Sequence, residues 1–560
     1  MSGSVPIDNS GAAPRGRTDE AFPTLTDEQI ERVQQFGETE DVCCGDVLFE
    51  RGDRTVDFFV LIEGCIEIYD HDCDGTTHVF TVHRERQFTG EIDLFSDRKI
   101  LVGGRMGGDG RVVRVGRKRF REMLSAEPDI GDVVLHAFIL RRLGLLEQNL
   151  GASTLIGGKS DPDTLRIRQF VRRNGYPVKA VYFEDGPEAS QALAKHGLSD
   201  ADAPVLFCAG EEPLVRPCTL AVAETIGIVE WPDTERVYDV AVIGAGPGGL
   251  AAAVYAASEG LDTVVVDRNG PGGQAGTSSK IENYLGFPNG LSGQQLAGRA
   301  QLQAQKFGAK LALPMTVTGI EGDGPPYTLH LEECDPVRCR SVVIASGAKY
   351  QTLKVDGFER YEGRGIHYAA TAIEGGLCGD EEVVVVGGGN SAGQAAVFLS
   401  GIARHVYMLV RGKELAASMS DYLVQRIDAS RSISLLCETS ITGLSGEDRL
   451  RGLTWQDRKT GETTAKDISN LFLMIGAAPH TSWLGDAVLT DERGFICTDS
   501  AVVEQGRWPL EDRSPEPFET SLPGVFAVGD VRHGSVKRVA SAVGEGSVCV
   551  QFVHRVLAEG

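Results

Sequence analysis

The sequence predicts a multidomain chain in which two doubly wound α/β domains follow a β-rich module and a small α/β module. Its 560 residues exceed what a single hydrophobic core supports. Short apolar strands separated by Gly and Asp turns fill residues 22–150, and strands alternate with helices over residues 151–230. Two units of strand, glycine turn and helix then begin near residues 240 and 384. Residues 1–21 are rich in Gly, Ser, Pro and charge, so we expect a disordered tail there.

The composition excludes several classes of function. A formal net charge of -24 repels nucleic acid and anionic lipid, so we expect neither as a partner. No apolar run reaches membrane-spanning length, and the first twenty residues lack the apolar stretch of a signal peptide. The 12 cysteines include no Cys-x-x-Cys pair and the 11 histidines are dispersed. We therefore expect a soluble protein of the reducing cytoplasm, without a disulfide framework or a metal site.

The first glycine turn lies in the run VYDVAVIGAGPGGLAAAVYAASEGLDTVVVDRNG. Gly244 permits the tight turn, Gly246 lets the backbone approach a pyrophosphate, and Gly249 permits close packing of helix on strand. Asp267, at the end of the second strand, can accept a hydrogen bond from a ribose 2′-hydroxyl and disfavours a phosphate there. The combination favours a dinucleotide site with an unphosphorylated ribose over a simple glycine turn.

The second glycine turn lies in EEVVVVGGGNSAGQAAVFLSGIARHVYMLVRGKEL and repeats the pattern with Gly387, Gly389 and Ala392. Its second strand ends in Arg411, with Lys413 nearby, instead of an acidic residue. A cation at this position suits a 2′-phosphate, so the sequence favours NADPH over NADH; the alternative is that Arg411 is an ordinary solvated side chain.

From Val237 to the C-terminus the chain resembles the low-molecular-weight bacterial thioredoxin reductases. The segment GPGGQAGTSSKIENYLGFP is similar to the flavin-contacting loop of that family, which implies that Gly273, Gln274 and Asn283 contact FAD. The resemblance also implies a homodimer and an FAD-binding domain split between residues 236–350 and 478–560.

A second stretch, TSLPGVFAVGDVRHGSVKRVASAVGEG, resembles the second FAD motif of the same family. By this resemblance Asp530 holds the ribityl or phosphate end of the cofactor, and Lys537 and Arg538 lie beside the flavin pyrimidine. The NAD(P)H-binding domain is then expected as an insertion over residues 351–477.

The redox dithiol of that family is missing. Family members place Cys-x-x-Cys just before the second glycine motif, where this chain has Ala369 and Ala372. Alanine forms neither a thiolate nor a mixed disulfide, and Cys378 is expected to be a buried structural residue. We name no catalytic residue. Electrons from FAD must pass directly to a diffusible acceptor, to a dithiol of a partner, or slowly to oxygen.

The first module resembles a cyclic-nucleotide-binding domain of β-roll fold, in the segments VLFERGDRTVDFFVLIEGCIEIYD and FTGEIDLFSDRKILVGGRM. The resemblance implies that Glu91 binds the ribose hydroxyl and Arg98 the cyclic phosphate. The phosphate-binding cassette, whose start is matched by Gly90-Glu91-Ile92, is shorter than in the family, and Ile100 stands where a small residue is preferred. A bound cyclic nucleotide and an altered ligand site are both left open.

Residues 151–230 resemble a thioredoxin or glutaredoxin fold. Ala203-Pro204 stands at the expected cis-proline position, and GGKSDPDTL replaces the redox cysteines. Cys208 and Cys218 are expected to be core residues, and the module a docking domain without a redox centre.

These observations support two alternative functions. The first is an NADPH-dependent FAD oxidoreductase without an internal dithiol, regulated by a nucleotide at the N-terminal domain. The alternative is a non-catalytic sensor that acts through the thioredoxin-like module.

Overall fold

The computed structural model describes residues 17–559 except 72–76, 91, 97, 149–152, 209–210, 279–280, 282–283, 362–363, 369, 371–374, 377, 416–418 and 448. Residue contacts divide the chain into two compact units. One contains residues 1–157, 167–232 and 302–314, and the other contains residues 158–166, 233–301 and 315–560. Among the described residues, no helix is both long and apolar enough to cross a membrane.

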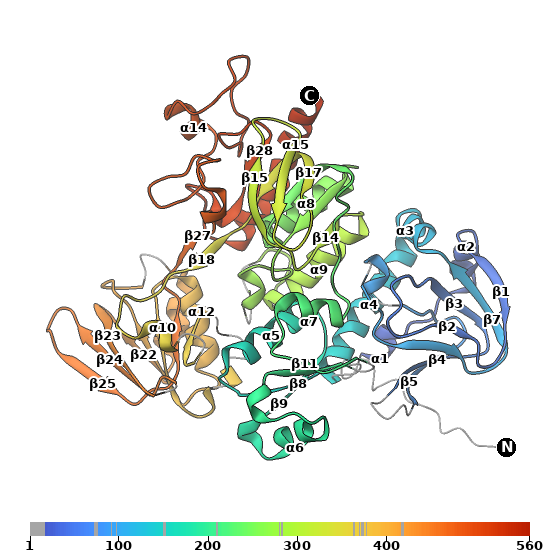
Figure 1. Cartoon of the computed structure of the whole chain (residues 1–560), viewed down its shortest axis with the longest axis horizontal. Coiled ribbons are helices and arrows are strands. Elements are labelled where there is room, and N and C mark those ends of the chain that lie inside the picture. Colours follow the sequence, from blue (N-terminus) through green and yellow to red (C-terminus); the bar gives the residue numbers. More distant parts are fainter. Residues whose placement is uncertain are drawn as a thin grey trace. The chain divides into compact units, whose positions relative to one another are not determined.

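The first module is a β-roll closed by helices (blue in Figure 1). Its elements are α1 (Thr18–Ala21), α2 (Asp27–Gln34), β1 (Glu38–Val42), β2 (Val47–Phe49), β3 (Phe58–Glu63), β4 (Ile66–His71), β5 (Thr77–His83), β6 (Gly103–Met106), β7 (Gly110–Val115), α3 (Arg117–Ala126) and α4 (Pro128–Gln148). The strands form two antiparallel sheets, in the orders β1-β7-β3 and β2-β6-β4-β5. Phe58 of β3 packs against Phe120 of α3, with ring centroids 4.8 Å apart, so apolar rings hold the helices on the sheet.

The start of this module differs from the prediction. Residues 18–21 belong to the predicted disordered tail, but they form α1, and Ala21 is fully buried in a cluster with Phe22 and Leu140 of α4. Four residues are too few to show a helical period in the sequence, which explains why this turn was not predicted.

The small α/β module has a sheet of order β11-β10-β8-β9. Its elements are β8 (Ser153–Gly157), α5 (Pro162–Arg173), β9 (Val178–Tyr182), α6 (Glu188–Lys195), β10 (Val205–Phe207), β11 (Leu214–Val215) and α7 (Thr219–Thr225). β8 and β9 are parallel, whereas β10 is antiparallel to β8. The Ala203-Pro204 bond before β10 is cis, as predicted.

The prediction that both cysteines of this module are core residues is wrong for Cys218. Cys208 is half-buried, and its sulfur lies 3.2 Å from the hydroxyl of Ser153. Cys218 is exposed and forms the N-cap of α7, where its sulfur accepts a hydrogen bond from the backbone N–H of Ala221. A capping side chain has to lie at the helix end, and here that end faces solvent.

The next part of the chain builds a sheet in which β13, β12, β17 and β28 are parallel. β15 and β16 continue the sheet beyond β17 as an antiparallel meander. The elements are β12 (Val237–Ile243), α8 (Pro247–Ser258), β13 (Thr263–Val266), α9 (Gly293–Lys306), β14 (Lys310–Ala312), β15 (Val317–Glu321), β16 (Tyr327–Leu331), β17 (Val337–Ile344), α14 (Ser500–Glu504), β28 (Val525–Ala527) and α15 (Val539–Glu559).

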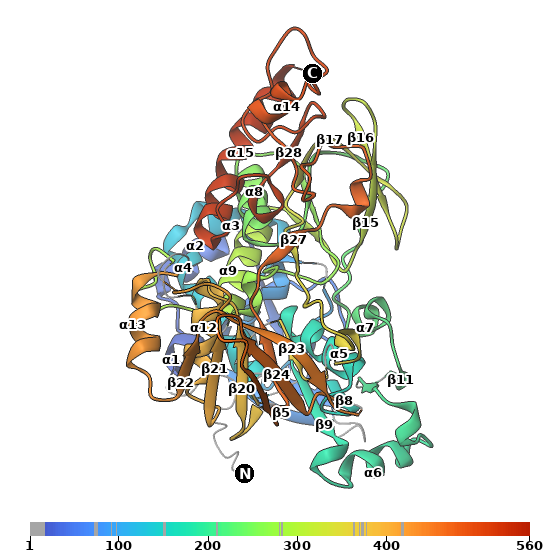
Figure 2. The same ribbon diagram turned by 90° about the vertical axis from the view of Figure 1, so that its left-hand side faces the viewer.

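The C-terminal segment returns to this sheet. β28 pairs with β17, and α15 packs along α8, as both ribbon views show (Figures 1 and 2). The two helices approach closely, because a Cβ added at Gly546 would lie 2.0 Å from the carbonyl oxygen of Gly248. Residues from both ends of the sequence range 236–560 therefore share one core.

The inserted segment forms a second parallel sheet of order β19-β26-β20-β21-β22. Its elements are β18 (Ala348–Tyr350), α10 (Phe358–Tyr361), β19 (Ile366–His367), β20 (Glu382–Val386), α12 (Asn390–Leu399), β21 (His405–Leu409), α13 (Asp421–Ala429), β22 (Ile433–Leu436), β23 (Thr439–Ser445), β24 (Gly452–Asp457), β25 (Thr463–Lys466), β26 (Leu471–Leu473) and β27 (Ala477–Pro479). β23, β24 and β25 form a separate antiparallel sheet. The entering strand β18 and the leaving strand β27 pair with each other, Ala348 opposite Pro479.

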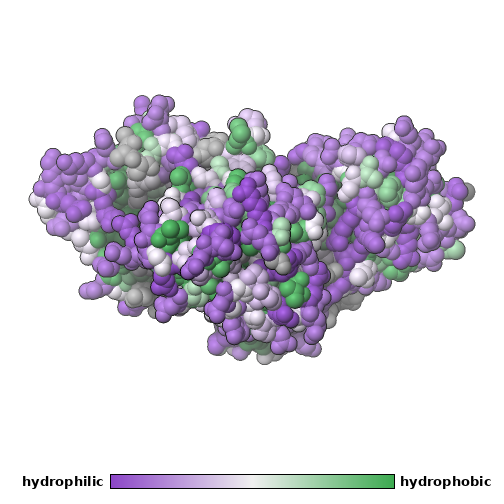
Figure 3. Space-filling model, turned by 90° about the horizontal axis from the view of Figure 1, so that it is seen from above, coloured by the Kyte–Doolittle hydropathy of each residue, from purple (hydrophilic) through white to green (hydrophobic). Residues whose placement is uncertain are grey.

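The face shown in Figure 3 is largely hydrophilic, with apolar residues in small separate groups. This distribution fits a chain with 24% charged residues and a mean hydropathy of -0.11.

Candidate dinucleotide-binding sites

The first glycine turn connects β12 to α8. Gly244 has a φ of +106°, and an added Cβ would lie 2.4 Å from the carbonyl oxygen of Ala345. A Cβ at Gly249 would lie 1.8 Å from the carbonyl oxygen of Gly244. Only glycine satisfies both positions, because a side chain would collide with backbone that cannot move independently. The predicted reasons for these two glycines therefore match the geometry.

The N-terminus of α8 is open to an anion. Gly246 is the N-cap residue, Pro247 follows at the first turn, and no side chain among the described residues caps the helix. The nearest atom to an added Cβ at Gly246 is the Cα of Gly273, 4.0 Å away. The first backbone N–H groups and the positive end of the helix dipole are thus available to a pyrophosphate.

Asp267 has a role that the sequence did not reveal. Its Oδ2 accepts the backbone N–H of Ala245 at 2.9 Å, and its Oδ1 accepts those of Asn269 and Gly270 at 2.8 Å. The carboxylate therefore ties the end of β13 to the glycine turn. A carboxylate has about four acceptor positions, so one remains for the predicted ribose hydroxyl.

The loop after β13 lies against the glycine turn. Gly272 donates its N–H to the carbonyl of Ala245 at 2.7 Å, and an added Cβ at Gly273 would lie 3.0 Å from the Cα of Gly246. The side chain of Gln274 donates to the carbonyl of Ala348. Gly273 therefore lies beside the first turn, whereas Asn283 lies outside the described residues.

The second motif is built around the turn that follows β28. Burial raises the pKa of Asp530, and the nearby charge of Lys537 opposes that rise. The Nζ of Lys537 donates to the carbonyl of Asp530 at 2.5 Å and to the Oγ of Ser535 at 3.0 Å. Arg538 is exposed immediately before α15. The structure therefore brings Lys537 to Asp530.

Two residues of this motif were not predicted. Glu545 of α15 accepts the N–H of Gly529 at 2.7 Å and forms an ion pair with Arg532 at 2.7 Å. The side chains of the pair are only 12% and 17% exposed. Glu545 therefore fixes the backbone directly before Asp530. Little in the sequence pointed to this pair, because the same motif contains other charged residues, among them Asp530 and Lys537.

The second glycine turn repeats the geometry of the first. Gly387 has a φ of +145°, and an added Cβ would lie 2.2 Å from the carbonyl oxygen of Met474. Gly389 is the N-cap of α12, and Ala392 is fully buried. The N-terminus of α12, which follows β20, therefore also lacks a side-chain cap among the described residues and can bind an anion.

Arg411 lies at the same edge of this sheet. Val386, the last residue of β20, is paired with Leu409, the last residue of β21, so the chain after β21 emerges beside the glycine turn. Arg411 is exposed, and its side chain makes no hydrogen bond or ion pair with any residue that the structure describes. A guanidinium in this position can pair with a phosphate.

The dithiol positions Ala369 and Ala372 lie outside the described residues. Cys378 is completely buried in the core cluster that contains Val383 and Ala396. The prediction that Cys378 is a core residue is confirmed.

In the β-roll, Glu91 also lies outside the described residues. Arg98 is only 3% exposed, and its Nη1 donates to the carbonyl of Asn174 at 3.0 Å. Its Nε lies 3.5 Å from Oε1 of Glu230. Ile100 is buried and exchanges backbone hydrogen bonds with the turn at Gly52 and Asp53. The predicted phosphate ligand is therefore in contact with residues that follow the β-roll in the sequence.

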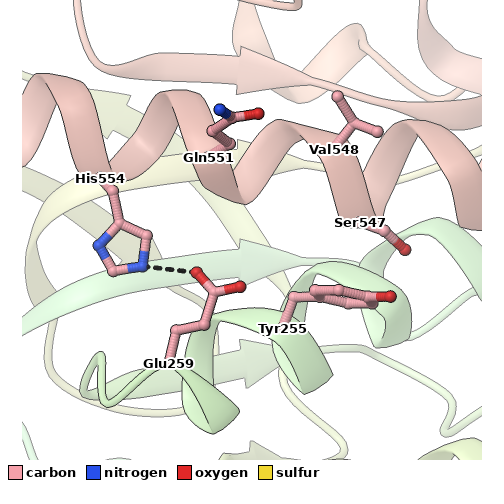
Figure 4. A pocket seen from close by; sticks show the side chains of 6 residues that line it. All are labelled: Tyr255, Glu259, Ser547, Val548, Gln551 and His554. Atoms are coloured by element: carbon pink, nitrogen blue, oxygen red, sulfur yellow. Dashed lines mark ion pairs between the residues drawn. The ribbon is translucent and has the colours of Figure 1, made fainter.

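A pocket of about 380 Å³ lies away from both glycine turns. It is lined by Tyr255, Glu259, Ser547, Val548, Gln551 and His554 (Figure 4). These residues lie near the C-terminal end of α8 and on the facing part of α15, and His554 pairs with Glu259 at 2.8 Å. The nucleotide turn is at the other end of α8, so this pocket is not part of the candidate site.

The two glycine turns lie in different sheets, and each connects a parallel strand to the helix that follows it. This arrangement defines a protein with two dinucleotide-binding domains. Residues 238–546 match the model of the family described as pyridine nucleotide-disulphide oxidoreductase. The chain belongs to this family, which implies FAD and NAD(P)H as cofactors. Residues 39–127 match the cyclic nucleotide-binding domain, so the β-roll is a domain of that type.

Several relatives that match the C-terminal part of the chain are named thioredoxin reductase. The chain is 33% identical over 326 residues to "Thioredoxin reductase" of Mycolicibacterium smegmatis, covering 58% of this chain and 98% of the relative. It matches the crystal structure of the Lactococcus lactis thioredoxin reductase with 30% identity and a TM-score of 0.52, over 58% of this chain and 100% of that one. The T. acidophilum thioredoxin reductase matches with 30% identity and a TM-score of 0.51, over 58% and 99%. The C-terminal part is therefore thioredoxin-reductase-like.

Proposed function

We propose that the protein is an NADPH-dependent FAD oxidoreductase of thioredoxin-reductase type that passes electrons to its acceptor without an internal dithiol. The observation that supports this most directly is the pair of open glycine turns in two parallel sheets, combined with alanine at both dithiol positions, Ala369 and Ala372. Bound together, the cofactors supply hydride transfer from nicotinamide to flavin. The chain supplies binding and orientation.

The residues that would contact FAD lie around the glycine turn between β12 and α8 and around Asp530. The N-terminus of α8 receives the pyrophosphate, and Gly273 leaves room for it because it has no side chain at the point where its loop approaches Gly246. Asp267 keeps the turn closed and offers its remaining acceptor position to the ribose. Asp530, held by the segment that Glu545 fixes, serves the ribityl or phosphate end. Lys537 and Arg538 lie beside the flavin ring.

The nicotinamide cofactor is NADPH. Arg411 is an exposed cation at the sheet edge that carries Gly387 and Gly389, and it is not paired with a described residue. A 2′-phosphate gives this guanidinium a charge-assisted partner, whereas the hydroxyl of NADH does not.

The acceptor receives electrons directly from the flavin. Cys378 is buried and cannot replace the missing pair of thiols, since a single cysteine forms no intramolecular disulfide. The relatives are named for reduction of thioredoxin, so thioredoxin is one candidate acceptor, alongside other small redox proteins. Residues 151–230, with a thioredoxin-like order of strands, act as the docking module. A cyclic nucleotide at the β-roll regulates the enzyme, which functions as a homodimer.

Anaerobic stopped-flow mixing of the FAD-loaded protein with NADPH or NADH tests the first half-reaction. We expect NADPH to bleach the flavin absorbance faster than NADH. A flavin that neither nucleotide bleaches would refute an enzymatic function. The reduced protein is then mixed with thioredoxin, ferredoxin, flavodoxin, a quinone and oxygen, and the acceptor is the one that reoxidises the flavin fastest.

The absence of a dithiol also fits a non-catalytic sensor, in which bound flavin and nucleotide set a conformation that a partner recognises. Steady NADPH consumption with any of these acceptors would exclude the sensor.

A further inference from the structure

The linker that follows the thioredoxin-like module carries a buried carboxylate. Glu230 is 5% exposed, and its neighbours Ile228 and Val229 are also buried. Its Oε1 lies 3.5 Å from Nε of Arg98 and 3.3 Å from the side-chain nitrogen of Gln305. These residues belong to the same compact unit, so the linker is part of the core of that unit.

Arg98 is incompletely paired in this arrangement. Its Nε and Nη2 are buried and have no hydrogen-bond partner among the described residues, and the contact with Glu230 is a single long ion pair. A guanidinium forms its strongest contacts as two parallel hydrogen bonds of about 2.7–2.9 Å to a carboxylate or phosphate. The 3.5 Å contact with Glu230 is longer than such a pair and involves one nitrogen of Arg98. An anion that makes two short hydrogen bonds to Arg98 would therefore bind it more strongly than Glu230 does.

Backbone carbonyls of the linker also accept hydrogen bonds from the β-roll. Lys99 donates its N–H to the carbonyl of Gly227 at 2.9 Å, and Arg54 donates to the carbonyl of Val229 at 3.3 Å. An added Cβ at Gly227 would lie 2.2 Å from the side chain of Lys99. The segment 227–230 therefore lies directly on the residues that follow the predicted phosphate ligand.

A phosphate and Glu230 cannot share Arg98. The buried pair is neutral, and a cyclic phosphate placed beside the carboxylate would put two negative charges against one cation in a region with little water. One anion has to leave when the other binds. Arg98 falls within residues 39–127, which match the cyclic nucleotide-binding domain, and this identifies the competing anion as a cyclic nucleotide.

We infer that Glu230 is an internal occupant of the phosphate position at Arg98, and that a cyclic nucleotide releases the linker by displacing it. The inference rests on the part of the proposed function that assigns a cyclic nucleotide to the β-roll. The displaced segment ends shortly before Asp233, where the chain passes into the unit that carries both glycine turns. Release of the linker is therefore the step that transmits binding along the chain.

The test measures binding of cyclic AMP and cyclic GMP to the full-length protein by calorimetry. The variant is Glu230→Gln, which removes the competing charge and preserves the shape. The matched control is Glu67→Gln, since Glu67 pairs with Arg105 at 2.9 Å in the same β-roll but lies outside the linker contact. We expect Glu230→Gln to lower the dissociation constant of the preferred nucleotide at least about tenfold, and the control to change it less than about twofold.

Hydrogen exchange on the wild-type protein gives a second measurement that needs no variant. The amide of Lys99, which donates to Gly227, and that of Ile228, which donates to Ala223, are expected to exchange faster when the nucleotide is saturating. Equal dissociation constants for wild type and Glu230→Gln, no binding to either protein, or unchanged exchange on binding would each overturn the inference. Neither measurement depends on turnover. Failure of NADPH to reduce the flavin would refute the proposed enzyme but not this inference. Equal nucleotide affinity of wild type and Glu230→Gln would refute this inference but not the proposed enzyme.

Discussion

Replacing Glu545 by glutamine is expected to loosen the flavin site without touching the flavin. The Glu545 carboxylate accepts the N–H of Gly529 at 2.7 Å and contacts Arg532 at 2.7 and 3.2 Å. Glutamine keeps one neutral acceptor but loses the negative charge, so Arg532, 17% exposed, loses the carboxylate with which it forms its ion pair.

The expected magnitude follows from these contacts. A hydrogen bond to a charged group contributes about 1.5–3 kcal/mol, and breaking a fully buried pair costs about 3–5 kcal/mol. The Glu545–Arg532 pair retains some exposure, so we expect a loss of about 2 kcal/mol. For a domain of this size that corresponds to a fall of about 4–8 °C in the unfolding midpoint.

The assay is the temperature at which flavin fluorescence appears as FAD leaves the protein. The control is Glu259→Gln, whose carboxylate is 45% exposed and pairs with His554 near the other end of α8. We expect the control to release FAD close to the wild-type temperature, because exposed pairs contribute little. Equal release temperatures for Glu545→Gln and wild type would show that the pair does not support the flavin site.

Three further predictions concern the two nucleotide sites. Gly249→Ala should yield protein without flavin, because the new Cβ would lie 1.8 Å from the carbonyl oxygen of Gly244; Gly298→Ala on α9 has nothing within 4 Å and should retain full flavin content in the same absorbance assay. Arg411→Ala should raise the KM for NADPH by about tenfold or more and leave that for NADH nearly unchanged, and a parallel rise for both would contradict a phosphate contact. Burial raises the pKa of Asp530, so its ionised form destabilises the folded protein once the pH exceeds the unfolded value of about 3.9, increasingly up to the raised pKa. Asp530→Asn should therefore raise the melting temperature of FAD-free protein at pH 7, with the gain shrinking as the pH falls toward the unfolded value of about 3.9, and a gain independent of pH would refute this cause.

The sequence predicted the features that local backbone geometry dictates. The positions of Gly244, Gly249 and Gly387 follow from turns in which a Cβ would collide with backbone, and spacing alone reveals such positions. The periodic apolar segments likewise predicted the strands and helices of the two parallel sheets.

Contacts between distant residues could not be predicted in this way. The pairing of Arg98 with Glu230 joins residues far apart in the chain, and the contacts of Asp267 with three backbone N–H groups depend on the exact path of the loop. Cys218 was placed in the core because cysteine is usually buried, but its capping position outweighed that preference. The ligand roles of all the predicted site residues, Asn283 and Glu91 among them, remain predictions.

The pairing of β18 with β27 has a consequence for how such a chain is assembled. Lys349 is opposite Ala478, so the two ends of the inserted domain are neighbouring strands, about 5 Å apart. A short turn could join them and leave the parallel strands of the surrounding sheet uninterrupted. The inserted domain therefore enters and leaves at one place, and its removal as one piece would leave the core of the surrounding sheet continuous.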